Sequence, residues 1–169
     1  MSRLVGGAIA AGAAGLGLVG AGVVKGIAGE DHSTRDDAGV IVEAGEVGAF
    51  RMRLGDCIAA IPPDGAFDSV EAVPCTSPHA AEVYAAFTLL GDEDAAWPGA
   101  VSVNTDADEG CYSRFTQFVG LAYEQSTYGF FSITPTQPSW EELDDREILC
   151  MIAPMDGSLS TGSAEDTAK

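Results

Sequence analysis

The fold is decided by the stretch Leu54-Gly55-Asp56-Cys57 together with the stretch Val73-Pro74-Cys75-Thr76-Ser77-Pro78-His79-Ala80-Ala81-Glu82-Val83. The Gly-Asp, Pro-Cys and Pro-His steps predict turns, and the two cysteines can link the segments on either side of them. The residues before this region are typical of a leader. The residues after it predict the rest of one small domain, which two further cysteines close.

Length and charge limit the class of protein. The chain has 169 residues, which is enough for one domain and too few for two. All 26 acidic residues lie at or after Glu30, where only six basic residues occur, so this part carries a net charge of −20. Such a surface repels phosphate backbones and anionic lipid headgroups. We therefore expect no nucleic acid among its partners.

Residues 1–28 predict an N-terminal transmembrane anchor or a signal sequence. Residues 4–24 carry no charge and lie between Arg3 and Lys25, a run long enough to cross a bilayer as a helix. Cleavage after the small residues at 26–28 is an alternative, and a glycine- and alanine-rich helix without a membrane role is a third. Small residues at a spacing of four would let two such helices approach closely and form a homodimer.

The rest of the chain divides into three parts. Residues 29–46 are polar and acidic without hydrophobic periodicity, which predicts an acidic linker that forms a flexible stalk. Residues 47–163 form the domain, and residues 164–169 a flexible tail, with fraying expected from Ser158 onward. Four cysteines without metal-ligand spacing favour an oxidising compartment. We therefore place the domain outside the cell on a single-pass membrane anchor, or secreted if the leader is cleaved.

Hydrophobic periodicity predicts an α+β fold, in which a small, mainly antiparallel sheet packs with one helix. Strands are expected at residues 49–54, 67–73, 80–90, 128–133 and 146–152, although the alanines of residues 80–90 would also suit a helix. The helix should begin near Asp106 and run to about Leu121. Its apolar face is made by Cys111, Phe115, Phe118 and Val119.

The four cysteines allow three pairings. Cys57 and Cys75 flank one turn region, whereas Cys111 lies on the helix face and Cys150 lies in the last strand. This placement favours the disulfides Cys57–Cys75 and Cys111–Cys150. Zinc sites usually contain cysteines two to four residues apart, and this sequence has no such pair, so we predict neither a metal nor another cofactor.

Several of these residues together resemble the septum formation family of actinobacterial envelope proteins. The resemblance covers about residues 47–163 and is carried by Gly55, Asp56 and Cys57, by Pro74, Cys75, Pro78, His79 and Glu82, by Trp97, Pro98 and Gly99, by Cys111, and by Pro135, Thr136, Ser139, Trp140, Asp145, Arg146 and Cys150. It implies a small extracytoplasmic, cysteine-containing domain behind a membrane segment and a role in cell division. It brings no established catalytic residue or ligand.

The sequence departs from that family at two positions. The family commonly has glycine before the Asp-Arg pair, where this chain has Asp144. A basic residue often follows its C-terminal Gly-Ser, whereas Gly162-Ser163 is followed here by Ala164-Glu165. The first departure bears on the conformation of a turn, and the second on the surface of the tail.

The residue types do not predict an enzyme. His79 is the single histidine of the domain, so any nucleophilic mechanism would have to use it. We interpret it instead as a partner of the turn around Pro78 and the Cys75 bridge. The acidic clusters at residues 92–94, 106–109 and 141–145 are interpreted as solvated surface, with calcium binding as the alternative.

We therefore expect a membrane-anchored, extracytoplasmic domain that binds other envelope or division proteins during septum formation or envelope assembly. Its contact residues would be aromatic and proline side chains in turns, unless both tryptophans lie in the core: Trp97, Pro98, Pro138 and Trp140. The alternative is an extracytoplasmic module that senses or scavenges a ligand or cation.

Overall fold

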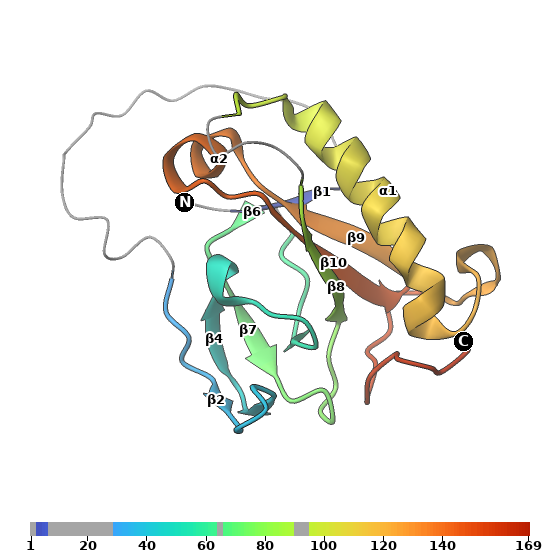
Figure 1. Cartoon of the computed structure of the whole chain (residues 1–169). Coiled ribbons are helices and arrows are strands. Elements are labelled where there is room, and N and C mark those ends of the chain that lie inside the picture. Colours follow the sequence, from blue (N-terminus) through green and yellow to red (C-terminus); the bar gives the residue numbers. More distant parts are fainter. Residues whose placement is uncertain (1–2, 7–28, 64–65, 90–94) are drawn as a thin grey trace.

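The computed structural model describes residues 3–6, 29–63, 66–89 and 95–169. One antiparallel sheet curls into a half-barrel, and a long helix lies across its outer face (Figure 1). A second, short helix lies near one end of the sheet (Figure 1). Two disulfides complete the α+β fold that the sequence predicts.

The strands of the main sheet follow the order β4-β7-β5-β8-β10-β9-β1-β6. Their bounds are β1 Arg3–Gly6, β4 Gly45–Gly48, β5 Cys57–Ile58, β6 Ala66–Phe67, β7 Ser69–Val73, β8 Ala81–Thr88, β9 Tyr128–Thr134 and β10 Glu147–Pro154. A separate hairpin pairs β2 (Thr34–Arg35) with β3 (Ile41–Glu43). The strands predicted at residues 67–73, 80–90, 128–133 and 146–152 are therefore confirmed, with small shifts of their ends and a break at Asp68.

The neighbouring strands β8 and β10 carry buried side chains on both faces of the sheet. Successive strand residues point to opposite faces, so Val83 lies in an inner core and Tyr84 in an outer one. In β10, Leu149 and Met151 join the inner core, whereas Ile148 and Ile152 join the outer one. Both faces of these strands therefore need a cover of apolar side chains.

Helix α1 (Ala100–Val119) covers the outer face. Its fully buried residues recur every four positions, at Val103, Ala107, Cys111, Phe115 and Val119. This confirms the predicted apolar face, to which Phe118 adds a half-buried ring. The helix begins six residues before Asp106, because the chain turns into it at Gly99, whose φ is 94°. Gly120, with φ 81°, ends it within one residue of the predicted position.

Two local predictions are wrong. Residues 49–54 do not form a strand, because their buried side chains, Ala49 and Met52, are three residues apart and match the 3-10 turn η1 (Ala49–Arg51). Pro138 and Trp140, which the sequence predicts in turns, lie in the helix α2 (Gln137–Leu143). Its start is fixed by a reciprocal cap, in which the Thr136 hydroxyl accepts the Ser139 N–H and the Ser139 hydroxyl accepts the Thr136 N–H.

Residues 29–46 form part of the fold and are not a flexible stalk. The segment 30–32 lies along the outer edge of β4, where the His32 N–H donates to Glu46 O at 2.8 Å and the Gly48 N–H donates to Glu30 O at 2.8 Å. The hairpin that follows buries Ile41 in the inner core. The polar composition concealed this order because backbone hydrogen bonds, rather than apolar side chains, hold most of the segment.

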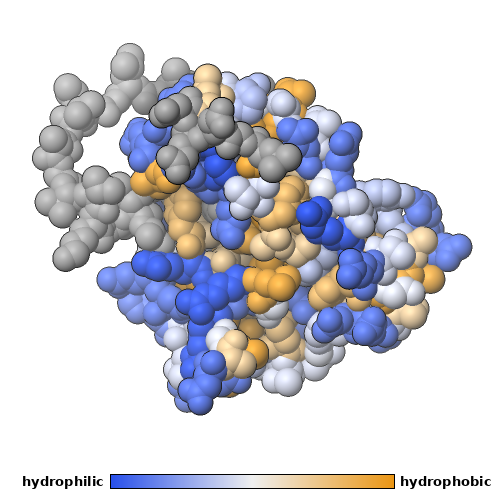
Figure 2. All heavy atoms as spheres, in the orientation of Figure 1, coloured by the Kyte–Doolittle hydropathy of each residue, from blue (hydrophilic) through white to orange (hydrophobic). Residues whose placement is uncertain are grey.

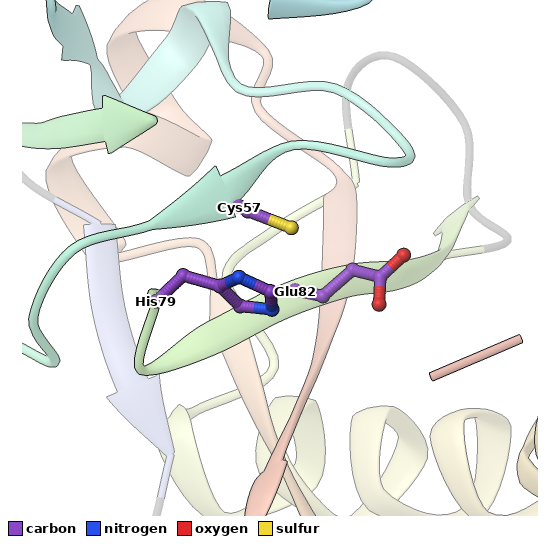
Figure 3. Close-up of side chains that lie close together, drawn as sticks. All are labelled: Cys57, His79 and Glu82. Carbon is purple, nitrogen blue, oxygen red and sulfur yellow. The ribbon is translucent and has the colours of Figure 1, made fainter. Parts of the chain in front are cut away.

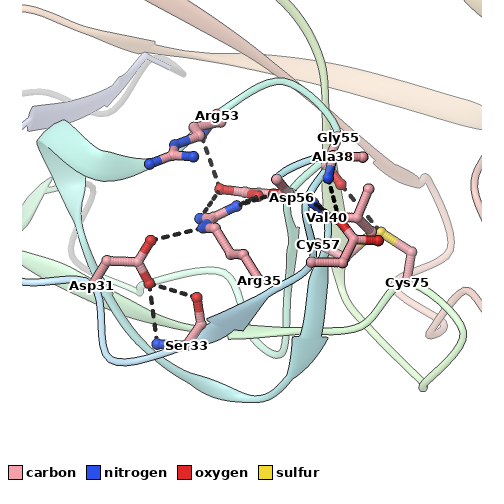
Figure 4. A network of polar contacts seen from close by, with 12 residues as sticks. Asp31, Ser33, Arg35, Ala38, Val40, Arg53, Gly55, Asp56, Cys57 and Cys75 are labelled. Atoms are coloured by element: carbon pink, nitrogen blue, oxygen red, sulfur yellow. Dashed lines mark hydrogen bonds and ion pairs between the residues drawn. A yellow bond between two sulfur atoms is a disulfide. The ribbon is translucent and has the colours of Figure 1, made fainter.

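One arginine attaches this N-terminal segment to the domain (Figure 4). The Arg35 guanidinium donates to both carboxylate oxygens of the buried Asp56, at 2.7 and 2.9 Å, and also to Asp31 at 2.7 Å. Burial would raise the pKa of Asp31, but hydrogen bonds from Ser33 and Arg35 outweigh it and lower that pKa below its usual value. The Asp31 carboxylate therefore stays ionised beside the guanidinium.

The structure describes little of the predicted leader. Residues 3–6 lie in β1, which pairs with β6 and β9, so the chain opens as a strand where the sequence predicts the start of a helix. Residues 7–28 lie outside the described residues, and with them the predicted cleavage pattern at 26–28 and all the small residues predicted to pair two helices. Within the described ranges, no helix has both the length and the apolar character needed to span a bilayer.

Replacing Arg35 with alanine should destabilise the domain. The change leaves the nearly buried Asp56 carboxylate without its bidentate partner, and we expect the free energy of unfolding to fall by about 3 kcal/mol. Arg35→Lys keeps the positive charge but not the two-pronged guanidinium. Its free energy of unfolding should lie between those of the wild type and Arg35→Ala. Urea unfolding measures the difference. Arg51→Ala, at an exposed arginine of η1, is the control, and an equal loss in both alanine variants would contradict the assignment.

The C-terminal residue of α2 offers a second test. Asp144 adopts a left-handed conformation, with φ 53°, at the position where the related family commonly has glycine. Asp144→Gly should give a domain about 1 kcal/mol more stable than Asp144→Ala, because only alanine keeps a Cβ in this conformation. Both variants lose the same ion pair to Arg146. Thermal unfolding compares them, and equal midpoints would show that the turn carries no strain.

Candidate functional site

A buried polar cluster lies where β5 meets β8. Cys57 opposes Glu82 in the antiparallel pair of these strands, and His79 lies just before β8. The Cys57 sulfur, a His79 ring nitrogen and a Glu82 carboxylate oxygen all lie within 4.8 Å of one another (Figure 3). The three residues are 0%, 1% and 4% exposed, respectively. The sequence region that decides the fold thus forms a compact group of potential ligand atoms.

His79 has the role that the sequence predicts for it. Its ring Nδ1 lies 2.9 Å from the carbonyl oxygen of Ser77, in the turn that contains Pro78. Because a carbonyl can only accept, Nδ1 carries the proton of this hydrogen bond. With Nδ1 as the donor, the lone pair of the uncharged form of the ring lies on Nε2.

Both predicted disulfides are present. Cys57–Cys75 joins β5 to the turn after β7, with 5.3 Å between the Cα atoms, and Cys111–Cys150 joins α1 to β10, with 5.5 Å. Their surroundings differ, because Cys111 and Cys150 are fully buried whereas Cys75 is partly exposed. The Cys75 sulfur lies 3.3 Å from the carbonyl oxygen of Gly55, in the Gly-Asp turn whose φ of 85° suits glycine.

The same cluster holds the C-terminal segment, which is ordered and not frayed. Glu82 accepts hydrogen bonds from the Ser163 hydroxyl at 2.6 Å and from the Ala164 N–H at 2.8 Å. His79 and Ser160 exchange two backbone hydrogen bonds, and the Gly162 N–H donates to Cys75 O at 2.7 Å. The predicted flexible tail at residues 164–169 continues along the end of α1, where the N–H groups of residues 166 and 168 donate to carbonyls of residues 118 and 119. These contacts are made by backbone atoms. Amino-acid composition does not reveal them, and it therefore predicted a frayed tail.

The second group of motif residues lies around Trp140. The Arg146 guanidinium stacks 3.6 Å from the centre of the Trp140 ring. It also donates a hydrogen bond to the backbone carbonyl oxygen of Trp140 at 2.9 Å. Asp145 accepts a hydrogen bond from the Ser139 hydroxyl at 3.0 Å, and the indole N–H donates to Ala95 O at 2.8 Å. These contacts fix the short helix α2 against the sheet.

The predicted contact surface therefore needs a correction. Trp140 is 4% exposed, so it is a core residue and cannot be a partner contact. Trp97 is half-buried and packs edge-to-face on Trp140, with 5.4 Å between the ring centres. Pro98 and Pro138 are exposed. Only the exposed edge of Trp97 and these two prolines remain available for contact.

Among the described residues, the acidic clusters at 106–109 and 141–145 form no group that could share an ion. Residues 92–94 lie outside the described residues, and residues 106–109 are spread around α1. In residues 141–145, Asp144 pairs with Arg146 and Asp145 with Ser139. Across the described chain, the one group of three acid, histidine or cysteine side chains close enough to share an ion is Cys57, His79 and Glu82.

An open pocket that the sequence does not predict lies beside the tail. It measures about 580 Å³ and is lined by residues 126–128, by residues of the segment 154–161 and by Lys169, many of which carry hydroxyl groups. The side chains of Met155 and Leu159 in this lining are exposed. A flatter hollow of about 340 Å³ lies next to α1 near Tyr84 and Phe118. No motif marks either one, because their walls come from parts of the sequence that are far apart.

This arrangement defines a small α+β domain with two disulfides. In it, the motif residues Asp56 and Glu82 anchor the segment around Arg35 and the C-terminal segment at residues 163–164. The chain belongs to the Septum formation family, whose match spans residues 43–167. Residues 29–42, including Arg35, thus precede the matched region although they are part of the fold.

Two curated relatives share the name "Putative lipoprotein LppN". One is from Mycobacterium bovis (strain ATCC BAA-935 / AF2122/97) and the other from Mycobacterium tuberculosis (strain ATCC 25618 / H37Rv). Each is 28% identical to this chain over 118 residues, which cover 68% of this chain and 63% of the relative. The chain thus spans less than two thirds of the length of these relatives. No solved structure matches it.

Glu82→Ala should release the tail. The variant leaves the Ala164 N–H and the Ser163 hydroxyl without their acceptor, and we expect a loss of about 2 kcal/mol in the free energy of unfolding. Amide hydrogen exchange should speed up across residues 160–168. Glu71→Ala, at an exposed glutamate in β7, serves as the control. Unchanged exchange in the tail of the Glu82 variant would refute the anchoring role.

Proposed function

We propose that this protein is an extracytoplasmic, envelope-attached domain that binds another envelope or division component during septum formation. The observation that carries the proposal is the match of residues 43–167 to the Septum formation family. Two disulfides support a location in an oxidising compartment. The names of the two relatives, which call them lipoproteins, support attachment to the envelope.

The proposed attachment is the uncharged segment at residues 4–24, and its use as a membrane helix requires residues 4–6 to leave strand β1. All four cysteines of this sequence are in disulfides, so a lipid on any of them would require a bridge to be broken. A membrane helix avoids this conflict.

The proposed role is binding and not catalysis. The surface carries acidic side chains in excess, and Figure 2 shows hydrophilic residues interspersed with apolar patches on one face. Such a charge favours a partner with a basic surface and speeds the encounter with it. The contact residues proposed are Pro98, Pro138 and the exposed edge of Trp97. Trp97 packs on the buried Trp140, and the two prolines lie close to these tryptophans in the sequence.

Site-specific crosslinking in cells tests this function. A photoreactive amino acid at Pro98 or Pro138 should capture a division or cell-wall protein, because both side chains are exposed beside the tryptophan pair. The same group at Glu71, an exposed position in β7, should capture less of it. Recovery of no division or cell-wall protein from any of the three positions would refute the proposed function. Equal capture at all three would refute the proposed contact surface.

A further inference from the structure

The cluster of Cys57, His79 and Glu82 has the organisation of a metal site in all but one respect. Protein ligands of metals are usually held by a second layer of hydrogen bonds. His79 gives its Nδ1 proton to the Ser77 carbonyl, which leaves Nε2 as the free donor atom. The Glu82 carboxylate is held by Ser163 and Ala164, and two hydrogen bonds leave lone pairs unused on its oxygens. Only Cys57 is blocked, because its sulfur is bonded to Cys75.

The blocking bond is the disulfide that a reductant can reach. Cys75 is partly exposed, whereas both partners of the Cys111–Cys150 bridge are 0% exposed. Attack of a thiolate on a disulfide requires access to a sulfur atom. An incoming thiolate can therefore reach Cys75, and the buried Cys57 is then the sulfur that leaves.

We propose that reduction of the Cys57–Cys75 disulfide creates a binding site for a divalent transition-metal cation of the zinc class, with Cys57, His79 and Glu82 as ligands. This inference goes beyond the proposed envelope function and does not depend on it. The oxidised domain has the bridge and no site, and the reduced domain has the site.

The chemistry balances with a dithiol as reductant. Its thiolate attacks the Cys75 sulfur, the Cys57–Cys75 bond breaks, and Cys57 leaves as a thiolate. The second thiol of the reductant then displaces Cys75, and the reductant becomes a cyclic disulfide after giving up two electrons. The cation binds the Cys57 thiolate, neutral Nε2 of His79 and a Glu82 oxygen. Any proton that Cys57 has taken up passes to solvent.

The geometry and the ligand types agree with this class of cation. Zinc bonds of about 2.0 to 2.3 Å place ligand atoms about 3.5 Å apart. Ligand atoms that lie within 4.8 Å of one another must therefore close by up to about 1.3 Å. Release of Cys57 from Cys75 frees its sulfur to make that movement. One sulfur, one nitrogen and one oxygen donor favour zinc or cobalt over calcium and magnesium, which prefer oxygen ligands. A water molecule or the Cys75 thiolate can complete four-fold coordination.

Titration of the full chain with Co²⁺ tests the site without a reductant. The Cys75→Ser variant frees Cys57 while the buried Cys111–Cys150 bridge remains. We expect it to bind one Co²⁺ per chain, with the near-ultraviolet absorption that a thiolate–cobalt bond gives, and Zn²⁺ should displace the Co²⁺. The double variant Cys57→Ser, Cys75→Ser is the matched control, since it also lacks the bridge but offers no thiol. It should show no such absorption.

Variants of the other ligands assign the remaining positions. In the Cys75→Ser background, His79→Ala and Glu82→Gln should each weaken Co²⁺ binding by more than about tenfold. Ser163→Ala removes a hydrogen bond to the ligand Glu82 and should weaken Co²⁺ binding by about tenfold. Absence of the absorption in folded Cys75→Ser would overturn the proposal. The proposal would also be overturned if the single variant Cys57→Ser, which keeps only the Cys75 thiol, gave an equal absorption. Unchanged Co²⁺ affinity in the His79→Ala variant of Cys75→Ser would overturn it too.

The wild-type chain keeps the proposal testable if Cys75→Ser does not fold. Limited reduction with a dithiol in the presence of Zn²⁺ should open Cys57–Cys75 before Cys111–Cys150, as read by mass spectrometry, and should leave a folded domain with one bound Zn²⁺. Reduction that unfolds the domain or that takes up no Zn²⁺ would overturn the proposal.

Discussion

The fold depends on the need to cover strands β8 and β10 on both faces. Their alternating apolar side chains divide between two cores, so neither face can be left in water. The curl of the sheet encloses the inner core, and the four-residue spacing of buried side chains on α1 matches the outer one. The Cys111–Cys150 bridge then ties the helix to β10 at the centre of this contact. Most of the described secondary structure therefore contributes side chains to one of these two cores.

The stretch around Cys57, Cys75 and Glu82 joins the parts of the chain that lie outside this double layer. Asp56 receives the N-terminal segment through Arg35, and Glu82 receives the C-terminal segment through backbone and hydroxyl donors. The Cys57–Cys75 disulfide lies beside these attachment points and joins β5 to the turn after β7. Both ends of the described domain are thus held by buried carboxylates from one small region, which explains why turn residues and acids are combined there.

The elements that the sequence predicts are those governed by apolar periodicity. The central strands, the face of α1 and both disulfides follow from where hydrophobic residues and cysteines recur. The missed elements depend on polar contacts between distant residues. The order of residues 29–46 rests on the Arg35 guanidinium and on backbone bonds to β4, and the order of the tail rests on Glu82. The lone arginine in an acidic segment and the Gly162-Ser163 pair were the available signals, but neither identifies its partner by spacing alone. The neighbourhood of Cys57, His79 and Glu82 follows from strand register, which turn chemistry at Gly55 and Pro78 does not fix.

The position of residues 30–32 along β4 has a consequence for how many copies can be packed together. An unpaired strand at the rim of a sheet is a template on which a neighbouring molecule can add its own strand, and such growth leads to aggregates. Here the chain covers that rim with the backbone of residues 30–32, and the Glu30 side chain beside it is exposed. Where two copies of the domain approach at this rim, the outer edge of β4 is already paired, so it offers no template on which a neighbouring molecule can add a strand.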